Sequence, residues 1–195
     1  MSHRVTELHS IMPIANIASA MAHGILSHEG AARLDHADVS LADVQDRCAR
    51  KSVPGGLRLH EYANLYFCAR NPMMYRRQDE RSRLCVLRVD RRVLELEGVV
   101  LTTGNAASPY SRFLSSPTGL RTISFDDVFA DYWTDANPIE QRRKKSAKCA
   151  EVLVPNCVEA HFITGAYVRG ETGRDALTST GFGLPITVNS NMFFC

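Results

Sequence analysis

The sequence predicts an α+β fold in which most strands pair antiparallel. Strand-like apolar runs crowd its second half, and the helix-like segments between them are short and irregularly placed. A doubly wound parallel sheet would instead alternate strands and helices regularly. With 195 residues, of which 45% are hydrophobic and 23% charged, the chain has an ordinary globular composition. We expect one domain, residues 1–195.

The first part of the chain is expected to supply one strand and two helices. Residues 7–12 (ELHSIM) alternate as a short strand does. Residues 13–24 (PIANIASAMAHG) carry apolar side chains at helical spacing, with Pro13 in the first turn and Gly24 as the stop. Residues 40–51 (SLADVQDRCARK) open with a capping-box pattern and end at the SVPGG that follows.

The remaining elements are mostly strands. Six runs rich in β-branched, leucine and aromatic residues predict strands at residues 64–69, 84–89, 98–103, 150–155, 162–168 and 185–191. Short helices are expected after Pro72, at residues 90–96 and at residues 124–133.

The composition argues against a membrane protein, a secreted protein and a metal site. No apolar run approaches the ~18 residues that cross a bilayer, and the N-terminus lacks the apolar segment of a secretory signal. None of the six cysteines stands in a CxxC pair, and the seven histidines include no HxxxH pair. We expect buried, reduced thiols in a cytoplasmic protein that binds no metal.

Arg70 follows an apolar strand and precedes Pro72, in the stretch NLYFCARNPMMY. An arginine just past a strand end is commonly an exposed surface residue. Here tyrosines, methionines and the proline make an apolar, aromatic setting, in which a guanidinium needs an anionic partner. That partner is either a carboxylate of the protein or a bound phosphate.

Glu151 lies in a strand that follows a basic run, in the stretch RRKKSAKCAEVLVP. The run is most simply a solvated face, and the alternative is a surface for phosphates. Strand alternation places Cys149, Glu151 and Leu153 on one face. A carboxylate in that company is either paired structurally or retained for function.

Two other stretches, LHSIMPIANI and TTGNAASPYSRF, carry weaker signals. His9 and Ser10 are neighbours on a strand that leads into a helix, and a lone strand histidine is most simply structural. Gly104 and Asn105 follow an apolar strand and predict a turn. The sequence has no P-loop, GxGxxG or GxSxG motif, so the common nucleotide-binding and hydrolase signatures are absent.

These stretches, in this order and with these separations, resemble the DarT family, the DNA ADP-ribosyltransferase toxins of bacterial toxin–antitoxin pairs. The similarity rests on NIASAMAHGILS, YANLYFCARNPMMY, LTTGNAASPYSRF, DYWTD and AEVLVPNCV, and it runs from about residue 8 to residue 168. The pieces LYFCARNPMMY and AEVLVP are the most specific.

The resemblance implies an ADP-ribosyltransferase-like fold: a split, mostly antiparallel β core with peripheral helices and NAD in the cleft. It implies that NAD is the co-substrate and that ADP-ribose is transferred to a nucleobase, thymine or guanine, in single-stranded DNA. It also implies a partner that reverses the modification, a macrodomain-type antitoxin.

Matched position by position, the resemblance implies that Glu151 is the catalytic glutamate and Arg70 the arginine against NAD and the target base. It places NAD binding at His9, Ser10, Asn16, Gly24, Arg70 and Tyr75. It places nucleic-acid binding at Tyr66, Asn105, Arg142, Arg143, Lys144, Lys145 and Lys148, with a substrate-recognition loop at about residues 134–148. The sequence departs from the family at HSIMPI, where a His-x-Thr-His character is usual, and at Asn105, where many members have histidine.

The chemistry implied by the resemblance needs a carboxylate at the reacting sugar. Breaking the nicotinamide–ribose bond develops positive charge on the ribose, and Glu151 is expected to stabilise that charge through the 2′-hydroxyl. Arg70 is a poor base because its pKa exceeds ~12. We expect it to clamp the diphosphate or an anionic base, while Glu151 or solvent takes the acceptor's proton. Tyr66 and Tyr75 are either stacking surfaces for a base or core aromatics.

Two rival functions use the same residues. A related transferase would modify RNA, a protein side chain or a terminal phosphate from the same NAD site. A degenerate module would bind nucleic acid without turnover, which the HSIMPI departure favours and the presence of both Arg70 and Glu151 disfavours.

Overall fold

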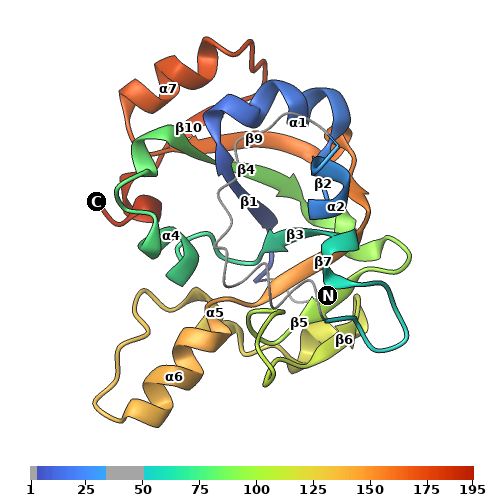
Figure 1. Cartoon of the computed structure of the whole chain (residues 1–195). Helices are drawn as coiled ribbons and strands as arrows, with labels where there is room; N and C mark the ends of the chain where they lie inside the picture. The colour runs from blue at the N-terminus through green and yellow to red at the C-terminus, as the bar shows by residue number, and fades with distance from the viewer. Residues whose placement is uncertain (1–3, 34–50) are drawn as a thin grey trace.

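A computed structural model describes residues 4–33 and 51–195, and it shows a central β-sheet surrounded by short helices (Figure 1). The larger sheet consists of β1 (Glu7–Pro13), β3 (Tyr62–Tyr66), β4 (Leu84–Asp90), β5 (Val100–Thr102), β6 (Phe113–Ser115), β7 (Glu151–Pro155), β9 (Ile163–Val168) and β10 (Ile186–Val188). A second, two-stranded sheet pairs β2 (Ile25–Leu26) with β8 (Cys157–Val158). The α-helices are α1 (Ile17–His23), α2 (His28–Ala31), α4 (Pro72–Arg76), α5 (Phe125–Phe129), α6 (Pro138–Ala147) and α7 (Glu171–Thr178). Short 3-10 helices are η1 (Ile14–Asn16), η2 (Leu59–Glu61), η3 (Arg81–Arg83), η4 (Arg91–Glu95), η5 (Thr118–Thr122), η6 (Ala160–Phe162) and η7 (Ser190–Phe193).

The strand order in the larger sheet is β10-β9-β4-β1-β3-β7-β5-β6. Its neighbouring strands are antiparallel, except for β9 and β10, which run parallel. The predicted α+β class with mostly antiparallel strands is therefore confirmed.

The sheet is split between β1 and β3. β1 pairs with β4 over its whole length, Glu7 to Pro13, and β3 pairs with β7 from Tyr62 to Tyr66. Only one residue pair, His9 opposite Tyr66, joins β1 to β3. The two halves therefore diverge on either side of this pair, as the resemblance implied for a split β core.

The two faces of the sheet are covered differently. Residues directly opposite each other on paired strands share a face, and side chains alternate along each strand. The largest hydrophobic cluster lies on one face and includes Leu8, Leu65, Leu87, Val152, Ile17 of α1 and Leu177 of α7. The other face carries two smaller clusters, one containing Ile11 and Val86 and one containing Leu153. The row of His9, Tyr66 and Glu151 is on this second face: Tyr66 packs against the first of these clusters, and Ala106, which contacts Glu151, belongs to the second.

Two local signals set the connections near that row. Gly24 ends α1 with φ at +83°, and a Cβ there would lie 2.4 Å from the carbonyl oxygen of Val158. Asn71 is fully buried and caps α4: its Oδ1 accepts hydrogen bonds from the N–H groups of Met73 and Met74, each 3.0 Å long. Its Nδ2 donates to the carbonyl of Cys68 at 3.0 Å, so one buried side chain shapes the turn that contains Arg70.

Several element predictions needed adjustment. The strand expected at residues 64–69 is Tyr62–Tyr66, because its register with β7 ends where β7 begins. The segment at residues 90–96 is a 3-10 helix rather than an α-helix. Strand β6 and helices α6 and α7 were not predicted, and α6 has almost no apolar residues from which periodicity could be read. The helix expected at residues 40–51 lies, apart from Lys51, outside the described residues.

Candidate active site

The strand register brings three predicted site residues into one row. His9 on β1 lies opposite Tyr66 on β3, and Tyr66 lies opposite Glu151 on β7. All three side chains therefore share the sheet face at the split. The sequence resemblance assigned these residues separate roles, and the structure places them side by side.

Glu151 is the first residue of β7 and is 2% exposed. Its Oε2 accepts a 3.0 Å hydrogen bond from the N–H of Ala106, and no ion pair to it is found among the described residues. Burial raises the pKa of the Glu151 carboxyl to about 8, against the lowering effects of the Ala106 N–H and the charge of Lys51. A carboxyl kept buried without an ion pair favours the functional alternative over a structural salt bridge.

The loop after β5 holds the group that Glu151 contacts. The hydroxyl of Thr102 accepts from the Glu151 N–H at 3.0 Å and donates to the Gly104 carbonyl at 2.6 Å. The Lys51 ammonium donates to the carbonyls of Ala106 and Ser108, each at 2.6 Å. These contacts fix the N–H of Ala106 toward the carboxyl.

Asn105 lies at the turn in the same loop, as predicted for Gly104–Asn105. Its side-chain oxygen accepts a 2.9 Å hydrogen bond from the N–H of Ala107. A Cβ at Gly104 would lie 2.4 Å from the hydroxyl of Ser146, at the end of α6. Glycine therefore lets this loop approach the helix that precedes Glu151.

His9 belongs to a polar network with Glu7, Arg88 and Tyr167. The Glu7 carboxylate accepts from Arg88 Nε at 2.7 Å and from the Tyr167 hydroxyl at 2.8 Å, and His9 Nε2 lies 3.2 Å from it. Burial alone would raise the pKa of Glu7, but the hydrogen bonds from His9, Arg88 and Tyr167 lower it to about 2. Glu7 is therefore a carboxylate at neutral pH, and His9 Nε2 must be the donor.

The second ring nitrogen of His9 has no such partner. His9 is 8% exposed, and its Nδ1 is buried with no hydrogen-bond partner in the part of the chain that the structure describes. In the neutral ring, this nitrogen is an acceptor. A hydroxyl or N–H group of a ligand would satisfy this acceptor, and a ribose carries such hydroxyls. Ser10, its neighbour, is buried and points to the opposite face, toward the main cluster.

Asn16 and Gly24 line one small pocket of about 130 Å³, together with Met12, Ser19 and Leu26. The pocket lies at the end of β1, between α1 and β2. The structure therefore brings these two predicted NAD-binding residues together, on a different side of β1 from His9.

Arg70 lies in the turn between β3 and α4, and no carboxylate of the described residues forms an ion pair with it. Its Nη1 donates to the carbonyl of Asn191, and its Cζ lies 4.0 Å from the centre of the Phe194 ring. Its Nε is buried without a hydrogen-bond partner among the described residues. The expectation of an anionic partner from the protein is therefore not met, and the alternative, a ligand, is favoured.

Tyr75, a predicted NAD contact, lies in an aromatic cluster with Trp133 and Phe194. The ring centroids are 5.2 to 5.8 Å apart and each pair is edge-to-face. Tyr75 is 49% exposed, so one side of its ring is open to solvent. Trp133 belongs to the DYWTD stretch of the resemblance, whereas nothing in the sequence pattern pointed to Phe194.

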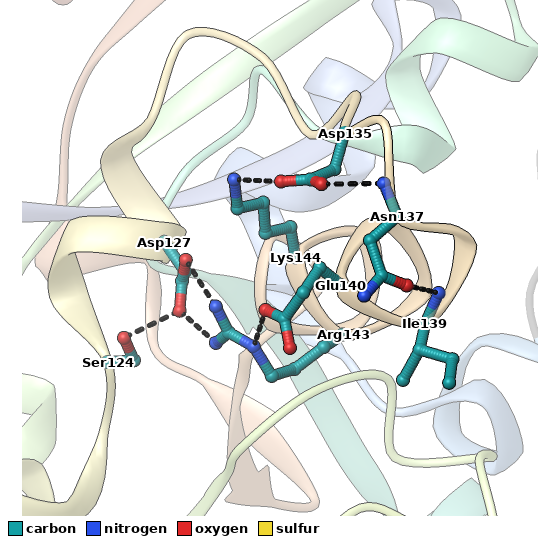
Figure 2. Close-up of polar contacts among 8 residues, drawn as sticks. All are labelled: Ser124, Asp127, Asp135, Asn137, Ile139, Glu140, Arg143 and Lys144. Carbon is teal, nitrogen blue, oxygen red and sulfur yellow. Dashed lines mark hydrogen bonds and ion pairs between the residues drawn. The ribbon is translucent and has the colours of Figure 1, made fainter.

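The basic run forms helix α6, capped by Asn137, rather than a loop (Figure 2). Arg143 donates to Asp127 at 2.5 Å and to Glu140 at 2.8 Å, and Lys144 pairs with Asp135 at 2.7 Å. The hydrogen bond from Arg143 is the largest cause that lowers the pKa of Asp127. Two of the predicted DNA-binding cations are therefore already paired within the protein.

The other three cations of the run differ from one another. Arg142 and Lys145 are exposed on α6 and make no ion pair among the described residues. Lys148 is 1% exposed, and its ammonium donates to the carbonyls of Val128 and Ala130 at 3.0 and 2.7 Å. The prediction that Lys148 contacts nucleic acid is wrong, because its ammonium is buried and hydrogen-bonded to these two carbonyls.

The five cysteines in the described ranges are free thiols, but only Cys85 is fully buried and Cys195 is exposed. The described part of the chain holds no group of three or more His, Cys, Asp or Glu side chains placed to bind a metal ion. Within residues 4–33 and 51–195, no helix is both long and apolar enough to span a bilayer.

Solved structures of DarT proteins share this architecture. The structure titled "Thermosipho africanus DarTG in complex with ADP-ribose" matches with a TM-score of 0.82 at 25% identity, over 96% of this chain and 51% of that one. The structure titled "Thermus sp. 2.9 DarT in complex with ADP-ribosylated ssDNA" matches with a TM-score of 0.81 at 22% identity, over 97% of this chain and 96% of that one. The fold of this chain is thus the fold of the DarT structures.

The sequence comparisons identify the family. The family model described as "ssDNA thymidine ADP-ribosyltransferase, DarT" matches residues 9–194, so the chain belongs to the DarT family. A Thermosipho africanus "DNA ADP-ribosyl transferase-DNA ADP-ribosyl glycohydrolase fusion protein" is 32% identical over 85% of this chain, which spans 43% of that protein. A Thermus sp. "DNA ADP-ribosyl transferase" is 27% identical over 73% of each chain.

Proposed function

We propose that this chain transfers ADP-ribose from NAD⁺ to a thymine base of single-stranded DNA. The observation that carries the proposal is Glu151, a buried carboxyl without an ion pair, in one row with His9 and Tyr66 at the split of the sheet. The description of the matched family names thymidine in single-stranded DNA, which favours thymine over guanine. The family match spans residues 9–194, in keeping with one catalytic domain.

In the proposed reaction, the bond between nicotinamide and the ribose C1 breaks and a bond from C1 to a ring nitrogen of the base forms. Nicotinamide leaves as a neutral molecule. Glu151, as the carboxylate, accepts a hydrogen bond from the ribose 2′-hydroxyl and stabilises the positive charge that develops on the sugar. A cationic substrate next to the carboxyl lowers its pKa, which favours the ionised form on binding.

The other residues of the site bind and orient. In the neutral ring, whose Nε2–H faces the Glu7 carboxylate, His9 Nδ1 is an acceptor that suits a ribose hydroxyl. The unpaired Nε of Arg70 suits an oxygen of the NAD⁺ diphosphate or of the base. Glu151 or solvent takes the proton from the base nitrogen, since Arg70 cannot. Tyr66 and the half-exposed Tyr75 offer ring faces to a splayed base.

Asn16 and Gly24 line the pocket that we assign to another part of NAD⁺, and Ser10, on the same side of β1, supports that side of the site. Asn105 shapes the loop after β5 that contacts Glu151, and we assign it to the DNA side of the site. Arg142 and Lys145, with Arg143 and Lys144 beside them on α6, would follow the phosphates without reading sequence.

We further propose that the chain is the toxin of a cytoplasmic toxin–antitoxin pair whose partner is a macrodomain-type hydrolase. The fusion of a transferase with a glycohydrolase in the Thermosipho relative supports this, since it joins the two opposing activities in one chain. Induction of the wild-type gene should then stop growth of a bacterial host, and Glu151→Gln should not. Growth arrest by both forms would contradict the toxin role.

The decisive test compares wild type, Glu151→Gln and a control, Glu171→Gln, which alters an exposed carboxylate on α7. Each is given NAD⁺ with single-stranded DNA, RNA or protein in parallel, and the products are identified by mass spectrometry of digested nucleosides and peptides. We expect ADP-ribosyl thymidine from wild type and control, and a loss on the order of 10²–10⁴ in rate for Glu151→Gln. Label only in RNA or protein would overturn the DNA assignment, and DNA binding without nicotinamide release would indicate a module without turnover.

A further inference from the structure

The end of the chain folds back onto the sheet face that carries the candidate active site. Helix η7 is capped by Asn189, whose side chain accepts a 3.1 Å hydrogen bond from the Met192 N–H. Phe193 is fully buried in the small cluster that contains Ile11 and Val86. In Figure 1 the C-terminus lies beside α4. The segment is therefore anchored in the core of this face.

Two groups of this segment hold the guanidinium of Arg70. The main-chain carbonyl of Asn191 accepts from Nη1, and the Phe194 ring covers the guanidinium with 4.0 Å between Cζ and the ring centre. Phe194 adopts the left-handed conformation, with φ at 60° and ψ at 46°. A bulky residue is rarely found there, so the surrounding contacts hold the ring in this position.

Phe194 also joins Arg70 to two other parts of the site. Its ring packs edge-to-face against Tyr75 of α4 at 5.2 Å and against Trp133 of the segment before α6 at 5.8 Å. The three rings bring together segments separated by dozens of residues in the sequence. Trp133 is the single tryptophan of the chain, so its fluorescence reports on this cluster alone.

The contacts of Arg70 with Asn191 and Phe194 leave some N–H donors of its guanidinium for a ligand. A guanidinium presents five N–H donors in a rigid planar fork. One Nη1 donor is used by Asn191, one face is covered by Phe194, and the buried Nε has no acceptor among the described residues. The Nε donor is therefore left for an acceptor that the described residues do not supply.

We propose that Phe194, together with the carbonyl of Asn191, positions Arg70 so that its remaining donors bind an oxygen of the substrate. Phe194 is a positioning residue: its ring contacts the guanidinium of Arg70, and it acts on the substrate through that group. The inference rests on the proposed function, because it assigns the orientation of Arg70 in the same transfer reaction.

The first test replaces Phe194 and measures kcat and KM for both NAD⁺ and single-stranded DNA. We expect Phe194→Ala to lower kcat/KM by about 5- to 30-fold, the change that follows from losing a partly buried cation–π contact. Phe194→Tyr keeps the ring and should stay within about twofold of wild type, whereas Phe194→Leu keeps bulk and should behave as Phe194→Ala. Cys195→Ser, which contacts Arg169 rather than Arg70, is the matched control in the same segment.

The second test is a double-mutant cycle with Arg70→Lys. Lysine keeps the charge but lacks the planar fork that lies over the ring. If Phe194 acts through Arg70, Phe194→Ala should change kcat/KM by less than about twofold in the Arg70→Lys background. An equal loss in both backgrounds would overturn the inference. The same cycle is measured on NAD⁺ affinity by calorimetry, which needs no turnover.

The third readout separates this inference from the proposed function. Phe194→Ala should shift the emission of Trp133, and Cys195→Ser should not, whether or not the protein modifies DNA. Unchanged emission would mean that the ring cluster does not form in solution, which would overturn the inference. A wild type that is inactive on DNA, with the emission shift present, would count against the proposed function alone. Melting temperatures of the Phe194 variants confirm that each one is folded.

Discussion

Glu151 and Arg70, the two charged residues proposed for the chemistry, are held in opposite ways. Glu151 is buried at the start of a central strand, and the neighbouring loop supplies its hydrogen bond. Arg70 lies in a turn and is held by the chain end, 121 residues away. Strand register therefore positions the carboxyl, whereas a tertiary contact positions the guanidinium. The position of Glu151 therefore follows from the local strand pattern, whereas the position of Arg70 depends on tertiary packing.

The dependence of kcat/KM on pH should show the largest difference between the region of Glu151 and the region of Arg70. With its pKa raised to about 8 by burial, Glu151 is mostly protonated in the free enzyme at neutral pH. Since kcat/KM reports ionisations of the free enzyme, it should rise about 50-fold from pH 6 to pH 8. Arg70→Lys should lower the rate but leave this midpoint unchanged, because Arg70 is not a cause of the shift. A flat profile would show that the carboxyl is already ionised.

The dependence of stability on pH, compared between wild type and Glu151→Gln, gives an independent check that the pKa of Glu151 is raised. The raised pKa means that the folded protein binds one more proton than the unfolded chain between about pH 4.5 and pH 8. The free energy of unfolding of wild type should therefore fall relative to that of Glu151→Gln as the pH rises through this window. Denaturant unfolding at several pH values measures it, and a difference independent of pH would contradict the burial effect.

A smaller effect is expected from Lys51, whose charge lowers the pKa of Glu151. Lys51→Met should move the pH profile of kcat/KM to higher pH and lower it at pH 7 by about 3- to 10-fold, with a smaller loss at pH 9. Lys145→Met, which removes an exposed cation of α6, is the control and should not move the midpoint. A uniform loss at all pH values would mean that Lys51 acts only by holding the loop of Ala106.

The smallest effect concerns the basic helix, where paired and unpaired cations stand side by side. Arg142→Ala should reduce the slope of log affinity for single-stranded DNA against log salt by about 0.7. Arg143→Ala should change the slope less, because Asp127 and Glu140 already neutralise that charge. Filter binding or anisotropy over a salt series measures both. Equal slopes for the two variants would show that the ion pairs of Arg143 open when DNA binds.

Much of the central sheet was predictable because each strand is a local signal. Apolar runs located β1, β4, β7 and β9 to within one or two residues, and alternation placed Glu151 on the same strand face as Leu153. Glu7, two residues from His9 on the same strand face, was visible in the sequence but was overlooked. Helix α6 was not predicted because its polar sequence shows no hydrophobic periodicity, although Asn137 and Pro138 form a recognisable helix start.

The charge states of the basic run were not predictable. Lys145 and Lys148 belong to the same basic run, yet the ammonium of Lys148 is buried against carbonyls and Lys145 is exposed. Lys51 and Phe194 carried no sequence signal at all, because their roles come from contacts with residues far along the chain.

The sequence by itself determined the α+β class, the succession of the main strands along the chain and the presence of a carboxyl on the same strand face as Leu153, because hydrophobic period and side-chain alternation are local properties of the backbone. Only the tertiary structure decided which charges are buried or paired, and which distant residues hold Arg70. Those outcomes depend on desolvation and on contacts between different segments, from 9 residues apart for Lys144 and Asp135 to 121 residues apart for Arg70 and Asn191, which no local pattern encodes.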